Sequence, residues 1–315
     1  MRAFLVVIAC VCITSSAQAV PIYWTDISPI GVGLNSAIKR ANADGSGVET
    51  LITGLKHPRG MDLDVPGGKM YWSEAGLLGI RRANLDGTGP AETVVPGQNG
   101  IAVDDVAVDV SAGKMYWTSC QSPIVAGGGR IQRASLDGSG VEDLVTVNLM
   151  NPVGIALDLQ QGKVYWTDLE GYHDGTGKIQ RSDLDGSSVE TLIAGIDEAN
   201  GLAVDAVGGK IYWPELTTGK IQRANLDGSG IEDLVVGLNT PTTIGLDLLG
   251  GKMYWTDSAD VGQLNRIERA NLDGSDREVV VSGGFPWGIA VVPEPSTALL
   301  LVAGISALLR RRGRA

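Results

Sequence analysis

Side chains that commonly carry catalysis are scarce in this sequence. Its 315 residues include 2 histidines and 3 cysteines. Cys10 and Cys12 lie in an apolar N-terminal stretch, which leaves Cys120 as a single thiol that can form neither an intrachain disulfide nor a cysteine-based zinc site. Cys120 is then either a loop cysteine without a special role or a reactive or intermolecularly paired thiol. No Gly-x-Ser-x-Gly elbow, Walker loop or His-Glu-x-x-His helix occurs, so we predict no catalytic residue.

Basic residues are also in deficit. The sequence has 25 Lys and Arg against 36 Asp and Glu, a formal net charge of −11. The arginines at the two ends are Arg2, Arg310, Arg311, Arg312 and Arg314, so the chain between the ends is more acidic still. An acidic body repels nucleic-acid phosphates and anionic membranes. We therefore expect no nucleic-acid partner.

Long hydrophobic runs are absent, and the two short ones lie at the ends. Met1 and Arg2 precede an apolar run over residues 3–13, and Ala17-Gln18-Ala19 follows it. A basic start, an apolar run and an Ala-x-Ala end are the three parts of a secretory signal. We predict a signal peptide over residues 1–19, cleaved after Ala19. A buried first strand, and a lipoprotein signal ending at Cys10 or Cys12, are the alternatives.

A Tyr-Trp dipeptide recurs along the chain, and it carries twelve of the sixteen aromatic residues. The steps between successive tryptophans are 48, 45, 49, 47 and 42 residues, a period typical of repeat architectures. Adjacent strand residues point to opposite faces, so each dipeptide puts a large ring on both sides of a sheet, and both sides must be covered. The dipeptides are Tyr23-Trp24, Tyr71-Trp72, Tyr116-Trp117, Tyr165-Trp166, Tyr212-Trp213 and Tyr254-Trp255.

Each repeat unit contains four short strand candidates. In the fourth unit they cover residues 154–158, 163–167, 178–184 and 189–193, with a hairpin signal at Asp185-Gly186. A stack of such sheets that closes into a ring leaves no aromatic face open. The sequence predicts an all-β, six-bladed β-propeller of four-stranded blades over residues 20–292. A first-strand segment, residues 288–292, is expected to pair with residues 22–24, so that both termini complete the first blade.

The repeated Tyr-Trp-Thr-Asp strand, the Ile-x-Arg-Ala-Asn-Leu-Asp-Gly strand and the Gly-Ile-Ala-Leu-Asp strand resemble the low-density lipoprotein receptor class B, or YWTD, repeat. The resemblance covers about residues 20–292 and implies a six-bladed propeller that acts as an extracellular binding module. Ser119, Pro214, Glu74 and Glu215 depart from the motif. At those positions, hydrogen bonding at the blade edges is expected to differ.

The C-terminal segment resembles a PEP-CTERM sorting signal. Pro293-Glu294-Pro295 is followed by an apolar run over residues 298–309 and by the arginine cluster. The resemblance implies a Gram-negative envelope protein that an exosortase-type enzyme processes and that reaches the cell surface or extracellular matrix. The sorting tail would be residues 293–315, with transient membrane contact. Twelve apolar residues span about 18 Å as a helix, short of a bilayer core, and a plain short tail anchor is the alternative.

Loop lengths separate two rims of the expected ring. The step from the last Asp of the first strand to the next Tyr is seven residues, as from Asp64 to Tyr71, whereas the step from Trp to the next third-strand Ile varies from eight to fourteen. Binding residues concentrate in variable loops on a rigid scaffold. We call the rim with the variable loops the variable rim and the opposite one the fixed rim. The candidate binding residues on the variable rim are Arg59, Asp105, Glu198, Asn200 and Trp287.

The acidic residues of the motif are expected to have a structural role, in hydrogen bonds between blades. Their predicted partners are the third-strand arginines Arg40, Arg82, Arg133, Arg181, Arg223 and Arg269.

We expect a monomeric, non-catalytic binding module without a cofactor, whose partner is a surface protein or polysaccharide. Two alternatives remain open. One is a metal-dependent lactonase or esterase resembling gluconolactonase, with calcium or another divalent ion held in the channel by Asp105, Glu198 and Asn200. The other is a structural matrix protein.

Overall fold

The computed structural model describes residues 21–27, 36–74, 79–97, 101–121, 127–169, 175–258 and 265–292. The predicted signal peptide over residues 1–19 and the sorting tail with Pro293, Glu294 and Pro295 lie outside these residues. Within the described chain every regular element is a strand, and none of it forms a helix long and apolar enough to cross a membrane.

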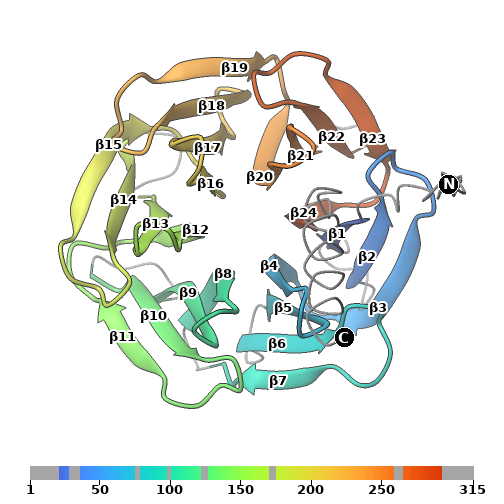
Figure 1. Cartoon of the computed structure of the whole chain (residues 1–315), viewed down its shortest axis with the longest axis horizontal. Coiled ribbons are helices and arrows are strands. Elements are labelled where there is room, and N and C mark those ends of the chain that lie inside the picture. The colour runs from blue at the N-terminus through green and yellow to red at the C-terminus, as the bar shows by residue number, and fades with distance from the viewer. Residues whose placement is uncertain are drawn as a thin grey trace, which may run out of the picture.

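Six four-stranded antiparallel sheets form a ring, which confirms the predicted propeller (Figure 1). From the channel outward, blade 1 contains β24 (Pro286–Val291), β1 (Pro21–Asp26), β2 (Ser36–Asn42) and β3 (Glu49–Leu55). Blade 2 contains β4 (Pro58–Asp64), β5 (Lys69–Glu74), β6 (Gly79–Asn84) and β7 (Glu92–Val95). Blade 3 contains β8 (Ile101–Asp109), β9 (Lys114–Gln121), β10 (Arg130–Ser135) and β11 (Glu142–Val145). Blade 4 contains β12 (Pro152–Asp158), β13 (Lys163–Asp168), β14 (Gly177–Asp183) and β15 (Glu190–Ile196). Blade 5 contains β16 (Ala203–Asp205), β17 (Lys210–Glu215), β18 (Lys220–Asn225) and β19 (Glu232–Val236). Blade 6 contains β20 (Thr240–Asp247), β21 (Lys252–Ser258), β22 (Arg266–Asn271) and β23 (Glu278–Ser282).

The aromatic dipeptides form the contacts between blades. All twelve rings are at most 2% exposed. Tyr23 of blade 1 packs in one cluster with Trp72 of blade 2, and the same pairing continues around the ring until Tyr254 of blade 6 meets Trp24 of blade 1. Each ring buries of order 150–250 Å². The apolar core is therefore six layers between neighbouring sheets, as the alternation of faces predicts.

The two termini close blade 1. β24 pairs antiparallel with β1, with Ile22 opposite Val291 and Trp24 opposite Ile289. The backbone N–H of Gly288 also donates to Thr25 Oγ1 at 2.8 Å. The predicted closure is thus present in the structure.

The motif threonine links neighbouring blades at the channel. Thr118 Oγ1 of blade 3 donates to the carbonyl of Val153 in blade 4 at 2.6 Å and accepts from the N–H of Asp105 in its own blade at 3.1 Å. Ser73 in blade 2 makes the same kind of link to the carbonyl of Asp104. In blade 5 the position is Pro214, which carries no hydroxyl, so this link cannot form there.

We predict that Thr118→Val lowers the free energy of unfolding by about 1–2 kcal/mol, because the partly buried carbonyl of Val153 and the partly buried amide of Asp105 lose their partner. Chemical denaturation measures this loss. Thr118→Ser is the matched control, since it keeps the hydroxyl as Ser73 does in blade 2, and it should cost much less. Equal losses for the two variants would contradict the hydrogen-bonding role.

The predicted partners of the motif acids were wrong. The third-strand arginines instead bind the acid at the start of the outer strand and a carbonyl of the next blade, as Arg181 binds Glu190 at 2.7 Å and the carbonyl of Leu226 at 2.9 Å. The motif acids accept from backbone amides of the loop that enters their own blade, as Asp168 accepts from Asn151 N at 2.8 Å. The arginine contacts connect neighbouring blades, whereas each motif acid holds the entering loop to its own blade, so the predicted role of the motif acids between blades was also wrong.

Candidate functional site

The channel mouth at the variable rim contains a cavity of about 290 Å³. Its walls come from the first residues of the inner strands and from the loops before them. Four of the five candidate residues line it together: Arg59 of β4, Asp105 of β8, Asn200 before β16, and Trp287 of β24. The structure thus brings residues from four blades to one site.

Backbone irregularities direct these side chains. The pairing register shifts between Pro58 and Met61 in β4 and between Val103 and Val106 in β8. Such bulges re-aim side chains and are common next to functional sites. Arg59 and Asp105 both lie within these shifts, at the point where the inner strands turn toward the channel.

Close approach of the inner strands requires glycine at the narrow part of the channel. A Cβ atom on Gly60 would lie 1.8 Å from Asp105 Oδ1, and one on Gly288 would lie 2.2 Å from the carbonyl oxygen of Arg59. Any larger residue would push the strands apart. The glycines therefore set the size of the cavity floor.

Arg59 has an internal partner. Its guanidinium forms an ion pair with Asp104, whose side chain is 6% exposed, while that of Arg59 is 37% exposed. Cys120 Sγ lies 3.7 Å from the second carboxylate oxygen of Asp104. Arg59 is thus held by charge and geometry at the mouth, and its loss would leave a buried carboxylate uncompensated.

Asp105 lines the cavity and also connects two blades by a hydrogen bond. Its carboxylate accepts from the backbone N–H of Val106 at 2.9 Å and from that of Ile155, in the next blade, at 3.1 Å. Burial raises the pKa of Asp105 to about 7, and the nearby charge of Asp62 adds to this. Burial likewise raises the pKa of Asp62 to about 6. These two carboxyl groups therefore hold protons near neutral pH more readily than ordinary aspartates.

Glu198 does not line the cavity. It is 6% exposed, has a positive φ of 49°, and its carbonyl accepts from the N–H of Leu216 at 3.2 Å, at the loop that follows β17. Of the three metal ligands that the hydrolase alternative requires, only Asp105 and Asn200 line the cavity. Among the described residues no group of three His, Cys, Asp or Glu side chains is placed to hold a metal ion.

The lining residues that were not among the candidates include Asn151, Thr243 and Cys120. Asn151 and Thr243 come from the starts of inner strands, where a Pro-x-Gly or Pro-x-Thr pattern could have located them. Cys120 also lines the cavity as a buried side chain near the end of β9. Burial raises the pKa of its thiol, which favours the unreactive protonated form. The prediction of a reactive thiol is not supported by this environment.

Parts of the chain are similar to known proteins. The family model for the low-density lipoprotein receptor repeat class B matches residues 162–206. A protein of Pyricularia oryzae named low-density lipoprotein receptor-related protein 1 is 32% identical over 230 residues, which cover 62% of this chain and 71% of that protein. Mouse nidogen-2 is 41% identical over 69 residues, which cover 21% of this chain and 4% of nidogen-2.

Solved structures share the architecture. A chain in the crystal structure of a nidogen/laminin complex superposes with a TM-score of 0.71 at 22% identity, covering 86% of this chain and 98% of that chain. TolB from Acinetobacter baumannii superposes with a TM-score of 0.70 at 15% identity, covering 87% of this chain and 67% of TolB. At these identities the likeness shows the fold.

Proposed function

This chain belongs to the low-density lipoprotein receptor class B repeat family, and from that premise we propose that its propeller is a non-catalytic module that binds a protein partner through the variable rim. The gathering of Arg59, Asp105, Asn200 and Trp287 around one cavity is the observation that carries the proposal. A structure of a related fold was solved as a nidogen/laminin complex, which supports a protein partner for this chain.

The size and surroundings of the cavity suit a protruding side chain of a partner. Its volume of about 290 Å³ is at the lower end for ligand pockets. Phe285, which directly precedes β24 and lies two residues before Trp287, is 46% exposed. An exposed aromatic residue beside a small pocket is typical of a protein interface. A flat or gently convex partner that inserts one residue would fit this mouth.

The proposed module acts outside the cytoplasm, at the cell surface. We propose that residues 1–19 direct export, and that the tail with Pro293, Glu294 and Pro295 brings an exosortase-type enzyme to the chain in a Gram-negative envelope. The partner would then be another protein of the surface or extracellular matrix, with a matrix polysaccharide as the competing ligand. A structural matrix protein would use the same rim to assemble with its neighbours.

We predict that Trp287→Ala weakens capture of the partner at least tenfold. The backbone carbonyl of Trp287, which accepts from Thr256 Oγ1 at 2.9 Å, is kept in this variant, so the fold should be retained. Quantitative mass spectrometry of proteins captured from envelope extracts by immobilised propeller measures the effect. Arg59→Ala is a poorer choice than the sequence suggests, because it would leave Asp104 buried without its cation.

Val207→Ala is the matched control, because Val207 is 88% exposed and lies on the fixed rim. It should capture the partner as the unchanged chain does. Capture that survives Trp287→Ala and is lost in Val207→Ala would place the interface on the other rim. If instead elemental analysis finds a stoichiometric divalent ion, and Asp105→Ala abolishes both its uptake and an esterase activity, the hydrolase replaces the binding module.

A further inference from the structure

The variable-rim cavity contains a carboxylate that no cation of the described chain compensates. Arg59 forms its ion pair with Asp104, whereas Asp105 takes part in no ion pair among the described residues. The two oxygens of Asp105 accept one backbone N–H each, from Val106 and Ile155. A carboxylate oxygen can accept more than one hydrogen bond. Because a buried carboxylate is usually paired with a cation, this cavity is suited to a cation from outside the chain.

The fold does not require an acid at position 105. Asp105 lies two residues before Ala107, which is paired with the motif tyrosine Tyr116. The same position in each of the other inner strands carries a small side chain or none. These residues are Gly288, Gly60, Gly154, Gly201 and Thr243 in blades 1, 2, 4, 5 and 6. The ring therefore closes with glycine at this position in four blades, and the carboxylate of blade 3 is an addition to the common pattern.

Two asparagine amides line the same cavity. Asn151 directly precedes β12 in blade 4, and Asn200 lies before β16 in blade 5. Neither amide group has a hydrogen-bond partner in the described part of the chain, although Asn151 is only 6% exposed. Buried polar side chains are normally hydrogen-bonded. A side-chain amide that is more than nine-tenths buried, lines a cavity and lacks a protein partner indicates that a group from outside the chain binds there.

These three side chains together suit an ammonium group. Asp105, Asn151 and Asn200 come from three consecutive blades, and each offers an oxygen that can accept a hydrogen bond. A lysine ammonium has three N–H donors around one compact charge and no acceptor. An arginine guanidinium is better matched by a carboxylate with both oxygens open to its planar fork, and the oxygens of Asp105 each accept a backbone N–H already.

The rest of the cavity wall suits the aliphatic stem of a lysine. Trp287, Val153 and Leu169 supply apolar surface to it. Trp287 belongs to β24 of blade 1, which lies across the ring from β12 of blade 4 (Figure 1). A lysine stem packs along apolar surface while its charged end reaches a polar group, and the face of an indole attracts a cation.

The charged groups around Asp105 leave the cavity open to a cation. Arg59 and Asp62 approach from β4, Asp104 from β8 and Cys120 from β9. Among the described lining residues, those of β12, β20 and β24 add no titratable side chain. Since Arg59 is paired with Asp104, it does not compensate Asp105. Burial, with a smaller effect of Asp62, raises the pKa of Asp105 to about 7, and a cation beside Asp105 would lower this pKa.

From these contacts we propose that the side chain which the partner inserts into the cavity is a lysine, with its ammonium bound by Asp105, Asn151 and Asn200 and its stem against Trp287. The inference rests on the proposed function, because it names the group with which the partner enters the variable rim.

Binding of this ammonium should strengthen as the pH rises. Only the ionised form of Asp105 pairs with a cation, and a group with a pKa of about 7 is about one-tenth ionised at pH 6 and about nine-tenths ionised at pH 8. The lysine amine, with a pKa of about 10.4, stays charged over this range. The dissociation constant should therefore be about tenfold lower at pH 8 than at pH 6.

Nuclear magnetic resonance titration of the ¹⁵N-labelled protein with Nα-acetyl-lysine methylamide tests the proposal. This probe should bind in a saturable way, at least tenfold more tightly at pH 8 than Nα-acetyl-norleucine methylamide, which has the same stem without the ammonium. In Asp105→Gly, both the preference for the lysine probe and its pH dependence should be lost. This variant should remain folded, as its spectrum will show, because four other blades carry glycine at this position.

Asp62→Ala is the matched control. Asp62 lines the second channel cavity but not the variable-rim cavity, and the residue opposite the motif tyrosine is alanine in four other blades. The control should bind the lysine probe at pH 8 within about twofold of the unchanged protein. The midpoint of its pH dependence should move to lower pH, because the charge of Asp62 no longer raises the pKa of Asp105.

Three results would overturn the proposal: equal affinity for the two probes, unchanged binding of the lysine probe in Asp105→Gly, or equal affinity at pH 6 and pH 8. A propeller that fails with the lysine probe but loses its partner in Trp287→Ala is a binding module with a different inserted group. Conversely, probe binding as expected beside capture that survives Trp287→Ala would overturn the proposed function and leave the cavity as a site for a free amine.

Discussion

A chain that ends at Trp287 should not fold into a stable ring, whereas a chain that ends at Val292 should be as stable as the full chain. The shorter chain lacks Gly288 to Val291 of β24, which pair with Ile22 to Trp24 of β1. It also loses the 2.8 Å hydrogen bond between Gly288 N and Thr25 Oγ1. Thermal and chemical denaturation of the two chains measure the difference.

The expected effect is large because two core layers lose a wall at once. Ile289 belongs to the cluster that buries Trp24 and Tyr254, and Ala290 belongs to the cluster that buries Tyr23. Opening these layers returns several large apolar side chains to water, at about 25 cal/mol for each Å². The sum is comparable with the whole stability of an ordinary domain, about 5–15 kcal/mol. Melting temperatures within a degree or two of each other would refute the closure by both termini.

The architecture could be predicted because its cause is local and repeated. An adjacent Tyr and Trp on one strand place a large ring on each face of the sheet, so both faces must be buried. Six copies at a nearly constant period can bury all of these faces when the sheets stack in a closed ring. The strand count also predicted the closure of the ring. The first unit begins without an inner strand, and the inner-strand segment over residues 288–292 is not followed by the other three strands of a unit. Both conclusions depend on which residues are present, which the sequence states directly.

The arginine partners were mispredicted because they depend on register. Tyr23 lies opposite Arg40, whereas the motif acid Asp26 lies opposite Ala37. Arg40 is therefore displaced by three residues along the strand pair, about 10 Å, and the odd offset places it on the other face of the sheet. The hairpin register would have excluded the pairing, but composition and spacing along one strand did not reveal it.

Four of the five candidate site residues line one cavity, whereas the fifth depends on local backbone conformation. Loop lengths singled out the variable rim, and four of the candidates placed there line one cavity. Glu198 belongs to the same loop as Asn200, yet its backbone takes a positive φ of 49° and its side chain does not line the cavity. A single residue in the left-handed region reverses the direction of a side chain, and no spacing rule predicts it.

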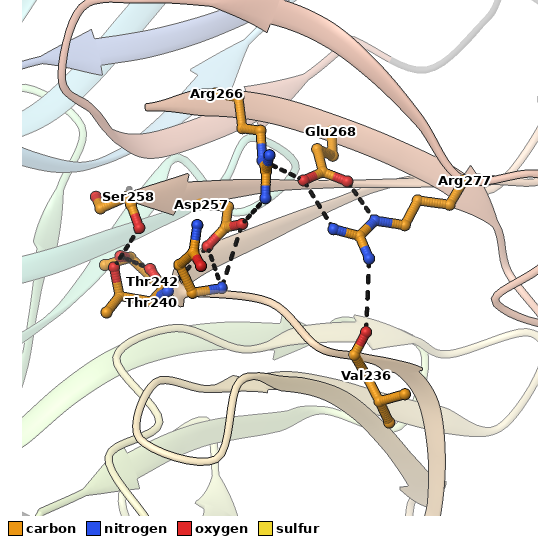
Figure 2. Close-up of polar contacts among 9 residues, drawn as sticks. Val236, Thr240, Thr242, Asp257, Ser258, Arg266, Glu268 and Arg277 are labelled. Carbon is orange, nitrogen blue, oxygen red and sulfur yellow. Dashed lines mark hydrogen bonds and ion pairs between the residues drawn. The ribbon is translucent and has the colours of Figure 1, made fainter. Parts of the chain in front are cut away.

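Blade 6 contains a chain of four ion-paired side chains, Asp257, Arg266, Glu268 and Arg277 (Figure 2). Arg266 lies between two carboxylates, with Nη2 at 2.9 Å from Asp257 Oδ2 and Nε at 2.5 Å from Glu268 Oε1. Arg277 binds both oxygens of Glu268, with Nε at Oε2 and Nη2 at 3.0 Å from Oε1, and its Nη1 lies 3.5 Å from the carbonyl oxygen of Val236 in blade 5. Both carboxylate side chains are at most 2% exposed, so the arginines compensate nearly all of their charge.

We predict that Arg266→Met lowers the free energy of unfolding by about 3–5 kcal/mol, because Asp257 and Glu268 then stay buried with half of their compensation removed. Arg130→Met is the matched control. Arg130 opens β10 as Arg266 opens β22, but its pair with Asp143 is exposed on both sides, at 35% and 39%, so its loss should cost less than about 1 kcal/mol. Equal losses in a chemical denaturation series would mean that burial of the carboxylates does not set the effect.

A second substitution separates uncompensated charge from lost packing. In blades 3, 4 and 5 the position of Glu268 is a glutamine. In blades 3 and 4 this glutamine accepts from the indole N–H of the motif tryptophan, as Gln132 does from Trp117 at 2.9 Å, whereas the indole of Trp213 in blade 5 has no such partner. The indole N–H of Trp255 has no hydrogen-bond partner among the described residues, and a glutamine at 268 could accept from it. Glu268→Gln added to Arg266→Met should therefore recover more than half of the lost stability. If the double variant is no more stable than Arg266→Met, the loss comes from the missing aliphatic stem of Arg266 rather than from buried charge.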